Sequence, residues 1–341
     1  MAASDLTSDG FALPPVLCFA LDGRGAAEPA SLDALGPPGH DARPEARGKA
    51  RPPFTWVHLQ REDAHTRPWL EAESGLDSFL QSALLADDTR PRCTVHGEGA
   101  IIILRGVNMM EGAEPEDMVS VRLWVDRARV IGVWVRPLSA VADIVSAIER
   151  GIAPVSPGEL VGKLAQRLAD RMEPHVSELH EELDAFEDAL LEDEAVKRGA
   201  LAHVRRRAIR LRRYIGPQRD ALTTLSIEDL SWLSDRDRSR VREAADKTTR
   251  ILEELEAVRE RAALIQDQIA EARGARMDRY MVLLSALAAI FLPLTLFTGL
   301  LGINVEGIPF AEREWAFAAV TGLILVAAAI LTFIFRKMKL L

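Results

Sequence analysis

The chain has 341 residues, a formal net charge of −9 at pH 7 and two cysteines, Cys18 and Cys93. The acidic balance disfavours nucleic acid as a partner and makes cations the more natural ligands. The two cysteines are too few and too scattered for a disulfide framework, which agrees with a reducing compartment. The first ten residues lack the basic and apolar regions of a signal peptide, so we expect the soluble part to be cytoplasmic.

The first 157 residues are predicted to form a cytoplasmic α/β domain. Residues 26–53 are rich in Pro, Gly and Ala and are interpreted as a loop or a poorly ordered insert. Apolar or β-branched stretches bounded by turn formers predict strands at residues 16–21, 55–59, 101–107, 119–125 and 130–135. Helical signals are interspersed at residues 76–85 and 138–150.

Residues 158–273 are predicted to form a cytoplasmic stalk of long helices. Apolar residues recur there at three- and four-residue steps, which predicts amphipathic helices at residues 159–214, 217–225 and 235–273. Gly216-Pro217 predicts a break, because proline removes a backbone donor and clashes with the preceding turn. Gly274 is only a weak interruption, so we expect one helix from near Asp235 to near Leu301.

Residues 274–341 are predicted to form a transmembrane hairpin. Residues 281–301 and 315–335 contain no charged side chain, and each run has the roughly 20 residues that a helix needs to cross a bilayer. Basic residues lie before the first span and after the second, whereas the connecting loop holds one arginine and three glutamates. The positive-inside rule therefore places both termini on the cytoplasmic side.

A path for ions through such a hairpin requires several copies around an axis, because two helices cannot enclose water. The first span carries one stripe at helical spacing, formed by Met281, Leu284, Ala288, Leu292, Thr295, Gly299 and Gly302. This stripe either lines a pore or packs on a neighbouring helix, since small residues are favoured wherever helices touch in membranes. Pro293 lies inside this span and permits a kink.

Gly302, Ile303 and Asn304 lie at the turn of the hairpin. Repeated around an axis, the Asn304 amide oxygens could hold the water shell of a divalent cation without stripping it. The alternative is an asparagine that turns the backbone locally. Both spans lack His, Cys, Asp and Glu, which argues against a tight, dehydrated zinc site within the membrane.

The stretch FLPLTLFTGLLGIN, followed by VEGIP and a second span, closely resembles the CorA superfamily of divalent cation transporters. The main branch carries Gly-Met-Asn at the turn, and Ile303 resembles the zinc-transporting ZntB branch instead. CTVHGEGAIIILRGVN, DMVSVRLWVD and LRRYIGPQRDAL also resemble that branch, so the resemblance extends from about Phe54 to the end of the sequence.

This resemblance implies a homopentamer with a cytoplasmic funnel in the inner membrane of a bacterium. The first span would line the pore, with Met281, Leu284, Leu292 and Thr295 at positions that line it in relatives. Gly302, Ile303 and Asn304 would form the outer selectivity loop. The implied function is transport of Zn²⁺, with no enzymatic reaction and no catalytic cofactor. The alternatives are a Mg²⁺/Co²⁺ channel of the main branch and a membrane-anchored signalling or scaffold protein.

Three further features have two interpretations each. Glu306 stands where the zinc branch commonly has glycine; a ring of such carboxylates would concentrate cations, or the residue is simply solvated. An acidic segment at residues 178–194 and a basic one at 205–213 are either complementary helix faces or, for the acidic one, a surface that gathers cations. His175 and His180 flank Glu178, and Cys93 lies near His96, but neither cluster alone supplies a tetrahedral zinc set.

Overall fold

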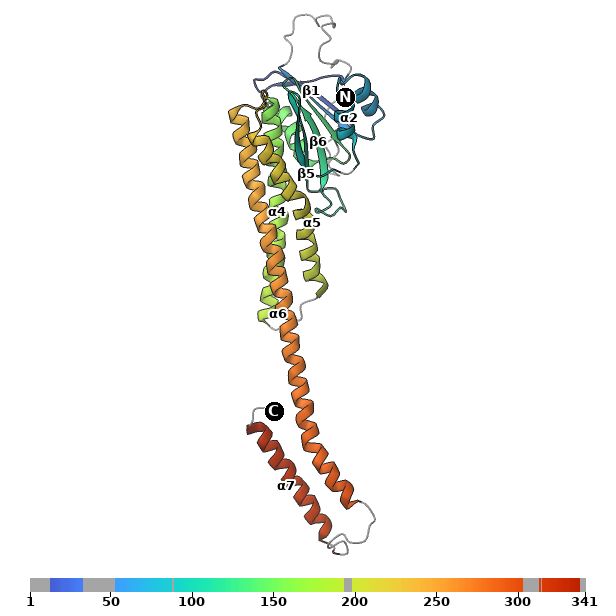
Figure 1. The fold of residues 1–341 in the computed structure, drawn as a ribbon, viewed down its shortest axis with the longest axis vertical. Helices are drawn as coiled ribbons and strands as arrows, with labels where there is room; N and C mark the ends of the chain where they lie inside the picture. The colour runs from blue at the N-terminus through green and yellow to red at the C-terminus, as the bar shows by residue number, and fades with distance from the viewer. Residues whose placement is uncertain are drawn as a thin grey trace, which may run out of the picture. The chain divides into compact units, whose positions relative to one another are not determined.

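The computed structural model describes residues 13–32, 53–87, 89–192, 198–302, 313 and 315–337 (Figure 1). The chain divides into two compact units, residues Met1–Ala263 and Leu264–Leu341. The α/β body and the long helices packed against it belong to the first unit. The second unit contains the apolar helices.

Among the described residues of the first unit, seven strands form one sheet in the order β2-β1-β3-β7-β6-β5-β4. The central pair β3–β7 is parallel, and the other neighbouring pairs are antiparallel. The strands are β1 (Val16–Leu21), β2 (Ala27–Pro29), β3 (Phe54–Gln60), β4 (Arg92–His96), β5 (Gly99–Gly106), β6 (Val119–Val125) and β7 (Arg129–Trp134). The five predicted strands are confirmed to within two residues.

Two strands depart from the expectations. β2 lies inside the segment that we expected to be a loop, and β4 was not predicted. Both are at the edges of the sheet, where one side of a strand faces water and the apolar pattern is weak. β2 has only three residues and contains Pro29, a residue that sheets tolerate at their edges.

The sheet is covered on both faces by helices, and the alternation of side chains along β5 shows how. Ile102 and Leu104 belong to a core shared with α3 (Ser139–Glu149) and α4 (Pro157–Leu191). Ile101 and Ile103 point the other way, into a core shared with α1 (Thr66–Ala72) and α2 (Ser78–Leu85). A strand buried on both faces is a continuous apolar run, which explains why β5 was easy to predict.

The long helices differ from the prediction at two places. The helix expected over residues 159–214 ends at Leu191, and α5 (Arg198–Ile227) begins after a connection. The break expected at Gly216-Pro217 is wrong, because α5 continues through Pro217. Proline removes one N–H, but Ile215 and Leu222 are buried on either side of it, and this packing holds the helix together.

The motif LRRYIGPQRDAL connects α5 to β5. The Gln218 side chain accepts a hydrogen bond of 2.6 Å from the backbone N–H of Arg105, and the Arg105 guanidinium lies 4.1 Å from the centre of the Tyr214 ring. Gln218 is 2% exposed. The motif therefore fixes how α5 packs on the end of β5.

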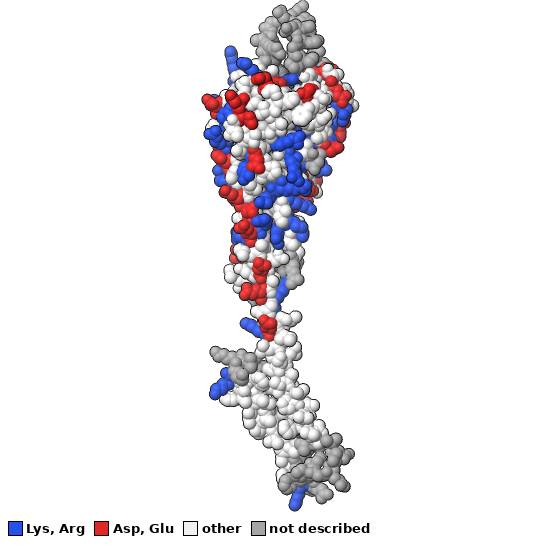
Figure 2. All heavy atoms as spheres, in the orientation of Figure 1, with Lys and Arg blue, Asp and Glu red and all other residues white. Residues whose placement is uncertain are grey.

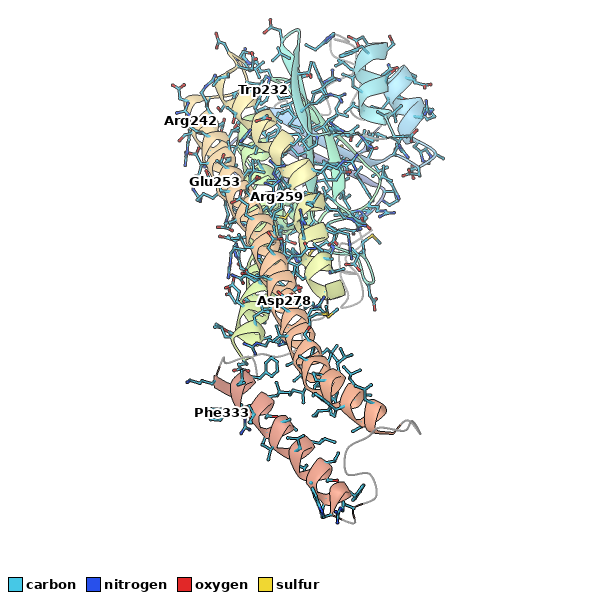
Figure 3. The ribbon with its side chains drawn as sticks, turned by 60° about the horizontal axis from the view of Figure 1, so that its bottom comes forward. Trp232, Arg242, Glu253, Arg259, Asp278 and Phe333 are labelled. Carbon is cyan, nitrogen blue, oxygen red and sulfur yellow. The ribbon has the colours of Figure 1, made fainter. Side chains whose placement is uncertain are left out.

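The expected helix from Asp235 to Leu301 is confirmed as α6. The beginning of α6 contacts the beginning of α4. Figure 3 labels Arg242 and Glu253 on this part of α6. The Ser156 and Ser234 hydroxyls both donate to Asp237, at 2.8 and 2.7 Å, and Arg240 pairs with Glu159 at 3.0 Å. These hydrogen bonds and this ion pair hold the first turns of α4 and α6 together.

The acidic segment of α4 is paired with cations of α5 and α6. Arg207 contacts Glu178 at 3.0 Å and also Glu182, and Arg261 contacts Asp184 and Glu187 at 2.6 and 2.7 Å. Burial alone would lower the pKa of Arg207, but Glu178 and Glu182 raise it above its ordinary value. For these residues the interpretation as complementary helix faces is confirmed.

Candidate functional site

The second unit contains the two helical segments predicted to span the membrane. The end of α6 and the whole of α7 (Ala316–Lys337) are long and apolar enough to cross a bilayer, and they lie side by side in both ribbon views (Figures 1 and 3). None of the most apolar window of α7 is buried in the single chain, and only 11% of that of α6. Such apolar, exposed helices require a lipid or protein environment.

One face of the α6 span is covered, and the predicted stripe lies on the opposite face. Ala286 and Ile290 are buried and Leu294 is partly buried, at a spacing of four residues. At 3.6 residues per turn, this line is on the other side of the helix from Leu284 and Leu292. The stripe is exposed along its length, at Met281, Leu284, Ala288, Leu292, Thr295 and Gly299. Its surface is therefore available to a pore or to another copy of the chain.

Thr295 adds a polar group to this exposed stripe. Its hydroxyl donates a 2.8 Å hydrogen bond to the backbone oxygen of Phe291, one turn earlier. This local bond uses the hydroxyl proton, so the oxygen lone pairs remain as acceptors. Thr295 can therefore accept hydrogen bonds from water around a cation without carrying a charge.

The helix closes at Gly302, the first residue of the predicted selectivity loop. The backbone N–H of Gly302 donates to the oxygen of Thr298 at 2.9 Å. A Cβ at this position would lie 3.1 Å from that same oxygen, which is tighter than an ordinary contact, so glycine suits the end of the helix. Ile303, Asn304 and Glu306 lie outside the described residues, and their roles stay predictions.

Pro293 lies within α6, which continues to Leu301. The proposed bend at this residue stays a prediction. Thr298, one turn and a half further on, was not singled out from the sequence. Its hydroxyl contacts the backbone oxygens of Leu294 and Thr295 at 3.0 Å each. Thr at intervals of three residues in an apolar run is a signal for such bonds, which satisfy the hydroxyl within the apolar segment.

The histidines and cysteines considered above as zinc ligands belong to the first unit, where His96 and His175 lie near carboxylates and the two cysteines are buried or partly buried. His175 Nδ1 lies 3.8 Å from Glu178 Oε2, and His96 Nε2 lies 2.6 Å from Asp77 Oδ2. In the part of the chain that the structure describes, no three His, Cys, Asp or Glu side chains are grouped to hold a metal ion. Burial raises the pKa of both Cys18 and Cys93 to about 12, so both thiols are protonated at neutral pH.

Comparisons with known proteins identify the family. The model of the CorA-like Mg²⁺ transporter protein family matches residues 53–337. The divalent cation transporter CmaX of Pseudomonas aeruginosa is 40% identical over 287 residues, which are 83% of this chain and 86% of that protein. The zinc transport protein ZntB of Pectobacterium atrosepticum is 35% identical over 262 residues, 77% of this chain and 80% of that protein.

A solved structure agrees with these matches. The structure of the full-length CmaX protein has a TM-score of 0.78 and 36% sequence identity, and the match covers 95% of this chain and 97% of that one. The matched region includes both the α/β body and the apolar helices. The chain therefore belongs to the CorA superfamily of metal-ion transporters, together with its ZntB and CmaX relatives.

Proposed function

We propose that this protein carries Zn²⁺ across the inner membrane of a bacterium. The observation that carries the proposal is the exposed stripe of the α6 span, which lies opposite the covered face and ends at Gly302. Membership of the CorA superfamily supports the transport of metal cations in general. The 35% sequence identity with ZntB, a zinc transport protein by name, supports zinc as the transported ion. The residue Ile303 supports the same choice.

The path requires more than one copy of the chain, and we propose a homopentamer with α6 as the lining helix. In that arrangement Met281, Leu284, Ala288, Leu292, Thr295 and Gly299 face the path, and Gly302, Ile303 and Asn304 surround its outer mouth. The stripe offers a hydroxyl oxygen and apolar surface but no charge. Weak contacts through the water shell would let a cation enter and leave, as conduction requires.

The orientation proposed for the hairpin places both termini on the cytoplasmic side. The described basic residues at the span ends, Arg276 and Arg279 on α6 and Arg336 and Lys337 on α7, support it. The outer loop would then carry Asn304 and Glu306 to the face from which a cation enters. Since neither span has an ionisable side chain between residues 281–301 and 316–335, a proton relay within the membrane would need water.

The test is metal influx into liposomes that contain the purified full chain. Zn²⁺, Mg²⁺ and Co²⁺ are compared with and without a pH gradient, using a metal-sensitive dye inside the vesicles. We expect zinc influx above that of empty liposomes. Influx of Mg²⁺ without Zn²⁺ would assign the protein to magnesium instead, and the absence of any metal flux would favour a signalling or scaffold protein.

A further inference from the structure

The helix α5 has an outer face that carries positive charge. Its buried residues recur at steps of three or four and define the inner face, at Val204, Ala208, Leu211 and Ile215. At 3.6 residues per turn, Arg206, Ile209 and Arg213 lie on the opposite side, and all three are exposed. Figure 2 shows basic side chains gathered on the part of the first unit where Figure 1 draws α5. The outer face of α5 is therefore an apolar residue between two arginines.

The two arginines of this face have no acidic partner in their own chain. Within the described residues, the side chains of Arg206 and Arg213 form no hydrogen bond or ion pair. The adjacent Arg207 and Arg212, in contrast, pair with glutamates of α4 and α6. The arginines that point along the chain's own helices are thus neutralised, whereas those of the outer face are available to another molecule.

The outer face of α6 has the opposite charge and the same spacing. Its inner face is marked by buried residues at the same steps, at Ile251, Leu255, Val258 and Ala262. Glu253, Ala257 and Glu260 lie on the other side of the helix and are exposed. Glu253 forms no ion pair within the described residues, and Glu260 lies 3.9 Å from Arg259. Two carboxylates with a small residue between them therefore match two arginines with an isoleucine between them.

The two outer faces lie at the same height along the helices. Arg212 Nε lies 2.5 Å from Glu256 Oε2, which fixes the position of α5 relative to α6. The two helices run in opposite directions (Figure 1). Counting along each helix from this contact places Arg213 within about one turn of the height of Glu253. Because the spacing is equal on both faces, the second arginine then lies near the height of the second glutamate.

The two outer faces point away from the buried sides of their helices, so they do not meet within one copy of the chain. A rotation about an axis along the helices leaves their heights unchanged and brings the α5 face of one copy to the α6 face of the next. Such a contact joins two different, complementary surfaces, which is the kind of interface that closes a ring of identical copies. An unrelated acidic protein would cover the α5 face only and would leave the acidic face of α6 without a partner.

We propose that the outer face of α5 in one copy docks on the outer face of α6 in the next copy. Two ion pairs flank an apolar centre in this contact, namely Arg206 with Glu260, Arg213 with Glu253, and Ile209 with Ala257. The inference rests on the homopentamer proposed above and identifies one of the contacts between its subunits. Exposed ion pairs contribute little affinity each, so their main effect is to select the neighbouring face and its register.

The test is disulfide formation between copies of the full chain in detergent, with Ile209→Cys and Ala257→Cys in the same chain. After mild oxidation, we expect linked dimers and larger species on a denaturing gel, and no linked chains with either cysteine alone. Cys18 and Cys93 give little background, because burial raises the pKa of both thiols to about 12. The matched control combines Ile209→Cys with Arg242→Cys and should stay unlinked. Arg242 is exposed on the same face of α6 (Figure 3), about four turns nearer the start of the helix.

A charge reversal in the cysteine pair variant tests the ion pairs. Arg213→Glu should lower the yield of linked chains about fivefold, the upper end for an exposed ion pair, and adding Glu253→Arg should restore the yield. The melting temperatures of the variants show that each is folded.

Light scattering of the parent chain in detergent separates this inference from the proposed assembly. A monomeric parent would contradict the homopentamer and the docking together. If the parent is oligomeric, the docking alone is overturned when the Ile209→Cys and Ala257→Cys pair stays unlinked or links no better than the Arg242→Cys control. Failure of Glu253→Arg to restore the yield would also overturn it.

Discussion

At the residue scale, Glu159 connects local helix chemistry to the stability of the first unit. Its carboxylate accepts a 2.7 Å hydrogen bond from the backbone N–H of Val155 and pairs with Arg240 at 3.0 Å, and Lys163 lies 3.4 Å away. Burial alone would raise the pKa of Glu159. The Val155 N–H and the two cations outweigh it, so the pKa lies below its ordinary value of 4.5. The folded state therefore stabilises the charged form of Glu159.

Glu159→Gln should lower the free energy of unfolding at pH 7 by about 1.5–3 kcal/mol, the range for a hydrogen bond to a charged group. A lowered pKa stabilises the fold above the unfolded value near 4.5, and this stability is lost as the pH falls towards the folded pKa. The difference between the variant and the parent should therefore shrink below about pH 4.5. Denaturant titrations at several pH values, followed by tryptophan fluorescence, measure this difference in the free energy of unfolding. A difference that does not change with pH would contradict the expected role of the Glu159 charge.

Asn304 is the polar residue at the proposed mouth. Asn304→Ala should abolish most zinc influx in liposomes, because it removes the ring of amide oxygens that would hold the water shell of the ion. Asn304→Gln keeps the amide and is the control, with partial influx expected. Normal influx through Asn304→Ala would show that the residue only turns the backbone.

Glu306 has a different expected effect, since its charge would act from a distance. Glu306→Gln should lower influx at limiting zinc and low salt, with little change at high salt, because salt screens the field of the carboxylate ring. Influx is measured over a series of zinc concentrations at two ionic strengths. Unchanged influx at low zinc and low salt would assign Glu306 to an ordinary solvated loop.

At the scale of elements, the pairing of β3 with β7 depends on a glycine. Gly132 lies opposite His58 in the register, and a Cβ there would lie 2.2 Å from His58 Nδ1. His58 is 1% exposed and stacks on Trp134 with ring centres 6.2 Å apart. Burial lowers the pKa of His58 to about 3, so the ring is neutral at physiological pH. It has no room to move away from a new methyl group.

Gly132→Ala should therefore destabilise the first unit by about 1–3 kcal/mol through overpacking. Gly274→Ala makes the same chemical change inside α6, where no atom other than its chain neighbours and the backbone of its own helix lies within 4 Å of the new Cβ. It should stabilise by about 0.5–1 kcal/mol, because alanine favours helices. Chemical denaturation of both variants gives the two signs, and the same sign for both would refute the packing argument.

The elements that could be predicted from the sequence are those whose pattern does not depend on tertiary contacts. β5 and β6 are long apolar runs, and α6 was expected at its observed bounds. The break at Pro217 was predicted wrongly. The local preference of proline does not include the packing of the buried residues on both sides of Pro217, which stabilises the helix. The edge strand β4 alternates weakly, and α1 has only seven residues, so neither gave a clear signal.

At the scale of the whole molecule, the family and the layout of the chain could be predicted because the turn motif and the two spans are local in sequence. The covered face of α6 could not be predicted, because the partner of an apolar helix decides which of its sides is covered. The contact between Gln218 and the backbone of Arg105 could not be predicted for a similar reason, because α5 and β5 are far apart in the sequence.

The central claim is that divalent cations pass along the exposed stripe of the α6 span. The most direct measurement is zinc influx into liposomes through Leu292→Cys and Ile290→Cys, before and after treatment with a positively charged thiol reagent. The parent chain is the background, because the pKa of both Cys18 and Cys93 is raised to about 12 by burial and their thiols react poorly. We predict that the reagent blocks influx through Leu292→Cys and leaves Ile290→Cys and the parent unaffected. Block at Ile290→Cys with none at Leu292→Cys would contradict the claim.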